Sequence, residues 1–345
     1  MIKVEKTTKV YAYCPSNVVT GGAELLHQLI STLNKNNIES YIVYFDDNNS
    51  KIPNDYEKYN LKIAKEIDDN PKNIVVFYEG IFEKTKLIKN AQILLWWLSV
   101  DNFYLASRKH LSLLDYFSWN WKYGFIVIAR RLGHLILKRK NYFFNNISLK
   151  QIKELNALNC YQSEYAQFYL NKKGFKETFP LTDYINTEFI TSKNPVNKER
   201  KILYNPKKGI NYTRKIMKLL PNEKWVALEN MTRDQLKNEL QTSMLYIDFG
   251  FHPGKDRIPR EAVLSDCCII TGRQGSANHF EDVCINEFYK IDEKKIAISK
   301  VRDRIIQILN NYNSHIENFE LYKKRIIKEK EVFEEEVKYI FQINN

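Results

Sequence analysis

The sequence lacks the cysteine patterns that build disulfide-rich or zinc-binding domains. It contains no CxxC pair and no Cys/His spacing of the kind that binds zinc. The number of cysteines is odd, so we interpret them as reduced, mostly buried thiols of a cytoplasmic protein. They are Cys14, Cys160, Cys267, Cys268 and Cys284.

Long apolar runs are also missing. The longest are far shorter than the stretch of about 20 residues that spans a bilayer. Residues 1–9 are charged and are followed by only a short apolar run, unlike a signal peptide. We therefore expect a cytoplasmic protein, or one that lies peripherally on the cytoplasmic face of the membrane.

Basic residues, in contrast, are in excess. The chain has 53 Lys and Arg against 41 Asp and Glu, a formal net charge of +12, which favours phosphate-bearing partners such as nucleotides, nucleic acid or an anionic membrane. With 44% hydrophobic and 27% charged residues, the composition excludes a disordered chain. A length of 345 residues is sufficient for two domains.

Both halves of the chain alternate β-prone runs with helix-like segments, which indicates parallel sheets covered by helices. In the second half, Thr232 and Gln235 form a capping box, and Pro259 stands where a first helical turn tolerates it. The predicted strands are residues 10–14, 41–45, 74–78, 93–98 and 156–161 in the first half, and 202–204, 225–228, 245–248, 268–271 and 288–291 in the second.

These patterns predict an α/β protein with two Rossmann-like, doubly wound domains that face a cleft. The predicted organisation is an N-terminal domain at 1–180 with a basic, aromatic insertion near 104–148, a linker at 181–199, a C-terminal domain at 200–316, and a charged helix at 317–345. Open parallel sheets bind ligands at the carboxyl ends of their strands, so we expect function in the loops that follow the strands.

Two such loops stand out in the first half. Gly21 and Gly22 are expected to form a turn before a helix that begins near Glu24, and the helix N-terminus offers free N–H groups. No GxGxxG pattern is present, so NAD binding gains no support. Asp101 follows an apolar strand, where its carboxylate is placed to act as a base or to contact a sugar. The alternatives are a simple turn and a helix-capping aspartate.

In the second half, Asn205 to Gly209 follow a strand. Lys207 or Lys208 would project from its end and suit a diphosphate, whose negative charge grows as a leaving group departs. The alternative is a solvated lysine turn.

Residues 252–261 follow the next strand and concentrate charge just before an apolar helix. His252 and Glu261 are candidate catalytic residues, and Lys255, Arg257 and Glu261 are candidate ligand-binding residues. Glu261 also has a purely structural explanation, because a carboxylate near a helix N-terminus complements the helix dipole.

Thr271, Gly272, Gly275 and Ser276 form a further loop, whose backbone N–H groups are suited to an anion. It would line the other wall of the same pocket.

The stretch 104–144 combines aromatic and basic residues. Such a stretch favours contact with anionic lipid headgroups, or alternatively a buried helical excursion with basic residues facing water. It includes Trp119, Trp121, Arg130, Arg131, Lys138, Arg139 and Lys140.

Taken in order along the chain, these motifs resemble the GT-B glycosyltransferases, in particular the retaining bacterial family 4 type of capsule, exopolysaccharide and lipopolysaccharide assembly. The matching stretches are Gly21-Gly-Ala-Glu24, Asn205-Pro-Lys-Lys-Gly209 and Arg260-Glu-Ala-Val-Leu-Ser-Asp-Cys-Cys-Ile-Ile-Thr-Gly272. The resemblance implies that the terminal helix crosses back to the first domain. It also implies that Glu261 contacts the ribose of a nucleotide-sugar donor.

One position departs from this family. Its motif has two glutamates, of which the second matches Glu261, while the first corresponds to Pro253. His252, Lys255 and Asp256 are the candidate substitutes, and the retaining outcome stays open.

The resemblance implies a nucleotide-sugar donor, with a UDP-sugar expected, held by Lys207 or Lys208, by Arg257 and Lys255, and by N–H groups near Gly275. No metal or other cofactor is expected, because cations and helix dipoles can neutralise the leaving group. A glycan or lipid-linked acceptor would enter near Gly21, Gly22 and Asp101.

Two alternatives remain at this point. The net charge is compatible with a nucleic-acid-binding protein, although the basic residues gather in post-strand loops rather than along one stripe. The missing first glutamate is compatible with a catalytically inactive GT-B scaffold.

Overall fold

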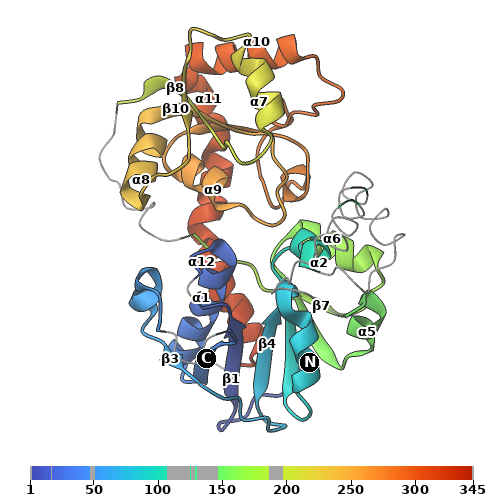
Figure 1. The fold of residues 1–345 in the computed structure, drawn as a ribbon. Helices are drawn as coiled ribbons and strands as arrows, with labels where there is room; N and C mark the ends of the chain where they lie inside the picture. Colours follow the sequence, from blue (N-terminus) through green and yellow to red (C-terminus); the bar gives the residue numbers. More distant parts are fainter. Residues whose placement is uncertain are drawn as a thin grey trace. The chain divides into compact units, whose positions relative to one another are not determined.

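The computed structural model describes residues 2–16, 18–46, 51–106, 125, 129, 147–185 and 197–343. The chain forms two compact units (Figure 1). Unit 1 comprises Met1–Gln162, Ala166–Thr182 and Glu334–Asn345, and unit 2 comprises Ser163–Tyr165 and Asp183–Phe333.

Two features follow the expectations from composition. All five cysteines are buried and free. Within the described ranges, none of the helices combines the length and the apolar character needed to cross a membrane.

Unit 1 is built on a parallel sheet. Its strands are β1 (Lys9–Cys14), β2 (Glu39–Tyr44), β3 (Lys62–Ile63), β4 (Ile74–Tyr78), β5 (Gln92–Trp97), β6 (Ala157–Tyr161) and β7 (Thr178–Pro180), in the order β3-β2-β1-β4-β5-β6-β7. Residues 74–77 of β4 are all buried, as expected for a central parallel strand with helices on both faces.

The helices of unit 1 connect these strands. In the described ranges the α-helices are α1 (Gly21–Lys35), α2 (Val100–Ala106), α5 (Leu149–Glu154) and α6 (Glu164–Lys172), of which residues 164 and 165 belong to unit 2. The expected turn at Gly21 and Gly22 is instead the first turn of α1, because the Thr20 hydroxyl accepts a hydrogen bond from the Ala23 N–H and starts the helix earlier.

Unit 2 has a smaller parallel sheet. Its strands are β8 (Glu199–Tyr204), β9 (Lys224–Ala227), β10 (Ser243–Asp248) and β11 (Cys268–Thr271), in the order β11-β10-β8-β9. The prediction of a fifth strand at 288–291 was wrong. The Asn286 side chain accepts from the Phe288 N–H and turns the backbone into the 3₁₀ helix Glu287–Tyr289, so only a single bridge from Lys290 to Thr271 remains.

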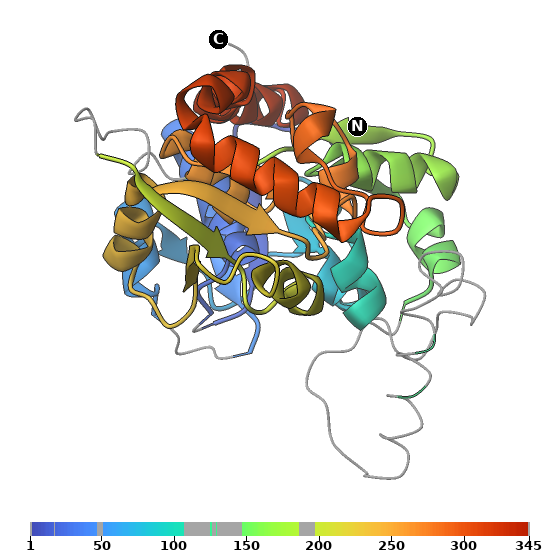
Figure 2. The same cartoon turned by 90° about the horizontal axis from the view of Figure 1, so that it is seen from above.

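Helices α7 (Ile210–Met217), α8 (Arg233–Thr242), α9 (Arg257–Leu264), α10 (Ile298–Asn310) and α11 (Tyr312–Ile316) surround this sheet. From β8 to β9 the chain moves one way along the sheet, and from β9 through β10 to β11 it moves the other way. Right-handed crossovers therefore place α7 on one face and both α8 and α9 on the other. Helix α10 packs against α7, and α8 against α9 (Figure 2). The capping box of Thr232 and Gln235 starts α8 as predicted.

Helix α12 (Glu320–Ile340) is the long charged helix that the sequence predicts. It begins in unit 2 and ends in unit 1, with the division after Phe333. Within unit 1, the Thr182 N–H and hydroxyl donate to Glu336 Oε2 at 2.6 and 2.8 Å. The terminal helix thus contributes to both units, as the predicted fold class requires.

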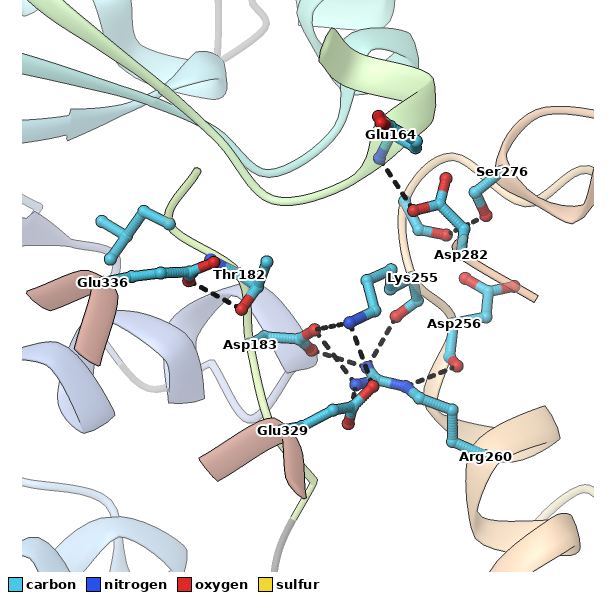
Figure 3. A network of polar contacts seen from close by, with 12 residues as sticks. Glu164, Thr182, Asp183, Lys255, Asp256, Arg260, Ser276, Asp282, Glu329 and Glu336 are labelled. Carbon is cyan, nitrogen blue, oxygen red and sulfur yellow. Dashed lines mark hydrogen bonds and ion pairs between the residues drawn. The ribbon is translucent and has the colours of Figure 1, made fainter. Parts of the chain in front are cut away.

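A buried group of charges ties α9, α12 and the segment after β7 together in unit 2 (Figure 3). The fully buried Arg260 guanidinium donates to both oxygens of Asp183 at 3.0 and 2.6 Å, and to Glu329 Oε2 at 2.7 Å. Lys255 Nζ lies 3.0 Å from Glu329 Oε1. Burial alone would raise the pKa of the Asp183 carboxyl, but the charges of Arg260 and Lys255 outweigh burial and lower that pKa. Two cations and two carboxylates therefore compensate one another.

We expect Arg260→Ala to destabilise unit 2 by about 3–5 kcal/mol, because it leaves the Asp183 and Glu329 carboxylates buried without this partner. Arg302→Ala is the matched control: Arg302 pairs with the neighbouring Asp303 at 2.7 Å on the surface, and its loss is expected to cost less than about 1 kcal/mol. Urea unfolding of both variants measures the difference. Equal losses would contradict a structural role for the buried group.

Candidate functional site

Three loops of unit 2 follow adjacent strands and meet at the carboxyl end of the sheet. Residues 205–209 follow β8, residues 249–256 follow β10, and residues 272–275 follow β11. Because these strands are neighbours and parallel, their following loops necessarily lie side by side. The loops contain most of the candidate donor-binding residues.

Glycines permit the close approach of these loops. Gly209 has a φ of +60°, and a Cβ there would stand 2.5 Å from the Phe249 carbonyl carbon. Gly275 has a φ of +64°, and a Cβ there would overlap the His252 carbonyl oxygen. A Cβ at Gly250 would overlap the stem of Lys208. Each contact therefore requires a residue without a side chain.

Backbone hydrogen bonds join the loops after β10 and β11. The Ser276 N–H donates to the His252 carbonyl at 2.9 Å, and the Gly272 N–H donates to the Asp248 carbonyl at 2.9 Å. The Ser276 hydroxyl donates to the Gly254 carbonyl at 2.6 Å (Figure 3). Ser276 and Gly275 thus hold the 249–256 loop in place.

A chain of ionisable groups runs from Lys208 into this loop. Lys208 Nζ lies 2.5 Å from Asp256 Oδ2, and the same oxygen lies 3.2 Å from Nδ1 of His252. On the other side of the imidazole, Nε2 lies 3.8 Å from Asp248 Oδ1. The His252 ring is fully buried, and neither of its nitrogens has a hydrogen-bond partner among the described residues.

Asp248, His252 and Asp256 place three potential metal-ligand atoms within 4.8 Å of one another. The Asp256 oxygen that faces His252 is, however, the one paired with Lys208. The lysine already supplies positive charge where a metal ion would bind, so the two would compete for this carboxylate.

Asp256 also occupies the N-cap position of α9, with φ −64° and ψ 141°. Its carboxylate is turned toward Lys208 and makes no capping hydrogen bond to the first turn of this helix. The Asp256 side chain therefore does not cap the first turn of α9, and a helix N-terminus of this kind is suited to an anion.

Glu261 lies in the second turn of α9 and is buried. Its Oε1 accepts a hydrogen bond from the Arg233 guanidinium, on α8, at 3.0 Å. Its Oε2 is buried and has no hydrogen-bond partner among the residues that the structure describes. Such an acceptor costs about 1–3 kcal/mol unless a donor reaches it.

Unit 2 contains four further candidates, Asn205, Lys207, Thr271 and Lys255. Asn205 accepts from the Lys207 N–H at 3.0 Å, which leaves the Lys207 side chain exposed at the loop. Thr271 is buried at the end of β11, and its hydroxyl has no partner in the described ranges. Lys255 stands apart, because its ammonium is held by Glu329 and, at 3.7 Å, by Asp183.

The candidates of unit 1 stand at the carboxyl ends of its own strands. Gly21 and Gly22 open α1. Glu24 is buried and accepts from the Tyr59 hydroxyl at 2.6 Å, so it fastens α1 to the segment after β2. Asp101 is the second residue of α2 and is 1% exposed.

Two further residues of interest, Glu79 and Arg233, were not predicted from the sequence. Glu79 directly follows β4, and its Oε2 accepts from the Leu98 N–H at 2.9 Å; burial raises its pKa to about 7. Its position after a predicted strand was a usable signal. Arg233 carried no such signal, because only the packing of α8 on α9 brings it to Glu261. The basic, aromatic residues 119, 121, 130, 131 and 138–140 lie outside the described residues.

No protein-family model matches the chain, and no curated protein matches it. Solved structures are similar to it. HepE of Anabaena, in complex with UDP-glucose, covers 97% of this chain and 99% of its own at a TM-score of 0.60 and 10% identity. Sucrose-phosphate synthase of Thermosynechococcus elongatus covers 97% and 98% at a TM-score of 0.63 and 10% identity. BGT of T4 phage, in complex with its UDP-glucose substrate, covers 97% and 99% at a TM-score of 0.53 and 10% identity.

At such low identity these similarities show the fold alone. They confirm the predicted fold class: the chain has the α/β architecture of GT-B proteins, with two Rossmann-like sheets.

We expect Gly275→Ala to destabilise unit 2 by about 3 kcal/mol, because the new Cβ overlaps the His252 carbonyl and the residue keeps a positive φ. Gly272→Ala is the control within the same loop: its nearest neighbour would be Glu293 Oε1 at 3.4 Å, and the expected cost is below about 1 kcal/mol. Urea unfolding compares the two. Equal tolerance of both substitutions would contradict the close approach of the loops.

Proposed function

We propose that this chain is a glycosyltransferase that moves a sugar from a nucleotide-sugar donor, with a UDP-sugar expected, to a glycan or lipid-linked acceptor. Structures that share its fold include HepE bound to UDP-glucose and BGT bound to its UDP-glucose substrate. The observation that carries the proposal is the arrangement at α9. A buried Glu261 oxygen has no hydrogen-bond partner among the described residues, and it lies close in sequence to the helix N-terminus where Asp256 turns to Lys208 instead of capping the helix.

The diphosphate would be held at the N-terminus of α9. Lys208 brings its ammonium to Asp256, the N-cap residue of this helix. The N-terminus of α9 adds a positive dipole end, and the exposed Lys207 adds further charge. As the sugar leaves, negative charge builds up on the diphosphate, and these groups stabilise it without a metal ion. Lys255 takes no part, since its charge is used inside unit 2.

The ribose would be bound by Glu261. A ribose hydroxyl that donates to Oε2 would satisfy the unpartnered oxygen, and the resulting hydrogen bond to a charged group contributes about 1.5–3 kcal/mol. Arg233 covers this carboxylate and is partly exposed, so its side chain is able to move aside for the nucleoside.

The acceptor would bind to unit 1, near Gly21, Gly22 and Asp101 at the carboxyl ends of its strands. We propose a role in bacterial surface polysaccharide synthesis on the cytoplasmic face of the membrane, with residues 104–148 in contact with anionic lipid. The proposed reaction retains the anomeric configuration. Pro253 stands in place of a glutamate, and the His252 ring is buried. Retention would therefore depend on how the donor and the acceptor are positioned, and not on a second carboxylate at position 253.

A thermal-shift screen with UDP-, GDP-, CMP- and ADP-sugars, with EDTA present, tests the function. A donor at about 100 times its Kd adds about 2.7 kcal/mol to the native state, which raises the Tm by a few degrees. We expect UDP-sugars to do so, and Glu261→Ala to weaken their binding about 10- to 100-fold.

The control variant is Glu331→Ala, which removes an exposed carboxylate of α12 and is expected to leave nucleotide binding unchanged. Slow donor hydrolysis that is lost in folded Glu261→Ala separates an enzyme from an inactive scaffold. If no nucleotide sugar shifts the Tm at millimolar concentration while an oligonucleotide does, the proposal is wrong.

A further inference from the structure

The proposed donor site contains a carboxylate, Asp256, that phosphate binding does not require. Asp256 stands at the N-terminus of α9, where an aspartate ordinarily caps the helix, yet its side chain points to Lys208 and His252. Its Oδ2 lies 2.5 Å from the lysine nitrogen. The most suitable cation for a diphosphate is therefore paired with an anion of the protein itself.

This pair is neither buried nor fully exposed. The Lys208 side chain is 32% exposed and the Asp256 side chain 20%, whereas the Lys255 side chain, in the structural group, is 10% exposed. Charges at this intermediate depth are screened by water in part, so a ligand with stronger charge is able to displace one partner.

Asp256 has an alternative partner within reach. Nδ1 of His252 lies 3.2 Å from the same oxygen, and Asp248 lies behind the imidazole at 3.8 Å. When a phosphate takes Lys208, Asp256 is not left without polar contacts, but it remains next to the new negative charge.

Resting on the proposed function, we propose that Asp256 is a specificity-determining residue of the donor site: it occupies Lys208 until a diphosphate displaces it, and then disfavours the free nucleoside diphosphate relative to the nucleotide sugar. The terminal phosphate of a nucleoside diphosphate is a monoester-like group that ionises a second time near about pH 6. The same phosphate esterified to a sugar cannot do so, and it carries one negative charge fewer at pH 8.

Repulsion from Asp256 is consequently stronger for the product than for the donor. A site that binds the donor without retaining the product releases the nucleoside diphosphate faster after transfer. Product release is the step that limits turnover in many enzymes, so this discrimination bears directly on the rate.

Titration calorimetry at pH 8 with the full chain tests the proposal, with UDP, UDP-glucose and uridine as ligands. Asp256→Asn keeps the size and removes the charge. We expect it to tighten UDP about tenfold and UDP-glucose about threefold, and to leave uridine unchanged, because only the phosphates meet the charge. Unchanged uridine binding also shows that the site is folded. If the Asn variant fails to fold, Asp256→Ser, which restores a common N-cap residue, replaces it.

Lys208→Met provides the matched control. It should weaken both phosphate ligands, and in its background the gain from Asp256→Asn for UDP should fall to about threefold, because repulsion remains while competition for the lysine is gone. The proposal is overturned if Asp256→Asn leaves UDP affinity unchanged or lowers it, or if UDP and UDP-glucose gain equally. A wild-type protein that binds neither nucleotide overturns the proposed function, and this proposal with it.

Discussion

The contact between the His252 carbonyl and Gly275 is the constraint on which the rest of the site depends. It brings the loop after β10 against the loop after β11, and the Ser276 N–H bond at 2.9 Å then fixes the two together. This approach supports the segment that leads into α9 at the carboxyl end of the sheet. This segment leads directly to Asp256, the N-cap of α9, and to Glu261 in the second turn of the helix.

Burial separates the two sets of charges in unit 2. Arg260 and Lys255 are enclosed with two carboxylates, and breaking such a set costs several kcal/mol, so these cations are committed to the fold. Lys208 and Asp256 are half-buried, where an ion pair is worth about 1 kcal/mol or less and a ligand can replace it. Two lysines on neighbouring loops therefore differ: Lys255 is committed to the fold, whereas Lys208 is the one that we propose binds a diphosphate.

Much of the fold was predictable because it rests on local patterns. The apolar runs predicted β8, β10 and β11, and the capping box of Thr232 correctly predicted the start of α8. The sequence also placed Lys208 and Glu261 in post-strand positions. It could not show that Lys255 turns to Glu329, or that Arg233 reaches Glu261, because both partners come from distant elements that meet only through tertiary packing. The strand predicted at 288–291 does not form, because the Asn286 side chain accepts from the Phe288 N–H and turns the backbone into a 3₁₀ helix.

We propose that a nucleotide binds at the carboxyl end of the unit 2 sheet. Hydrogen exchange of the full chain with and without saturating UDP tests it most directly, since ligand contact slows amide exchange in the segments that it orders. We expect slower exchange in residues 205–209, 249–258 and 272–276, with little change at the opposite ends of the same strands. Protection confined to other segments, or none in these loops at saturation, would contradict it.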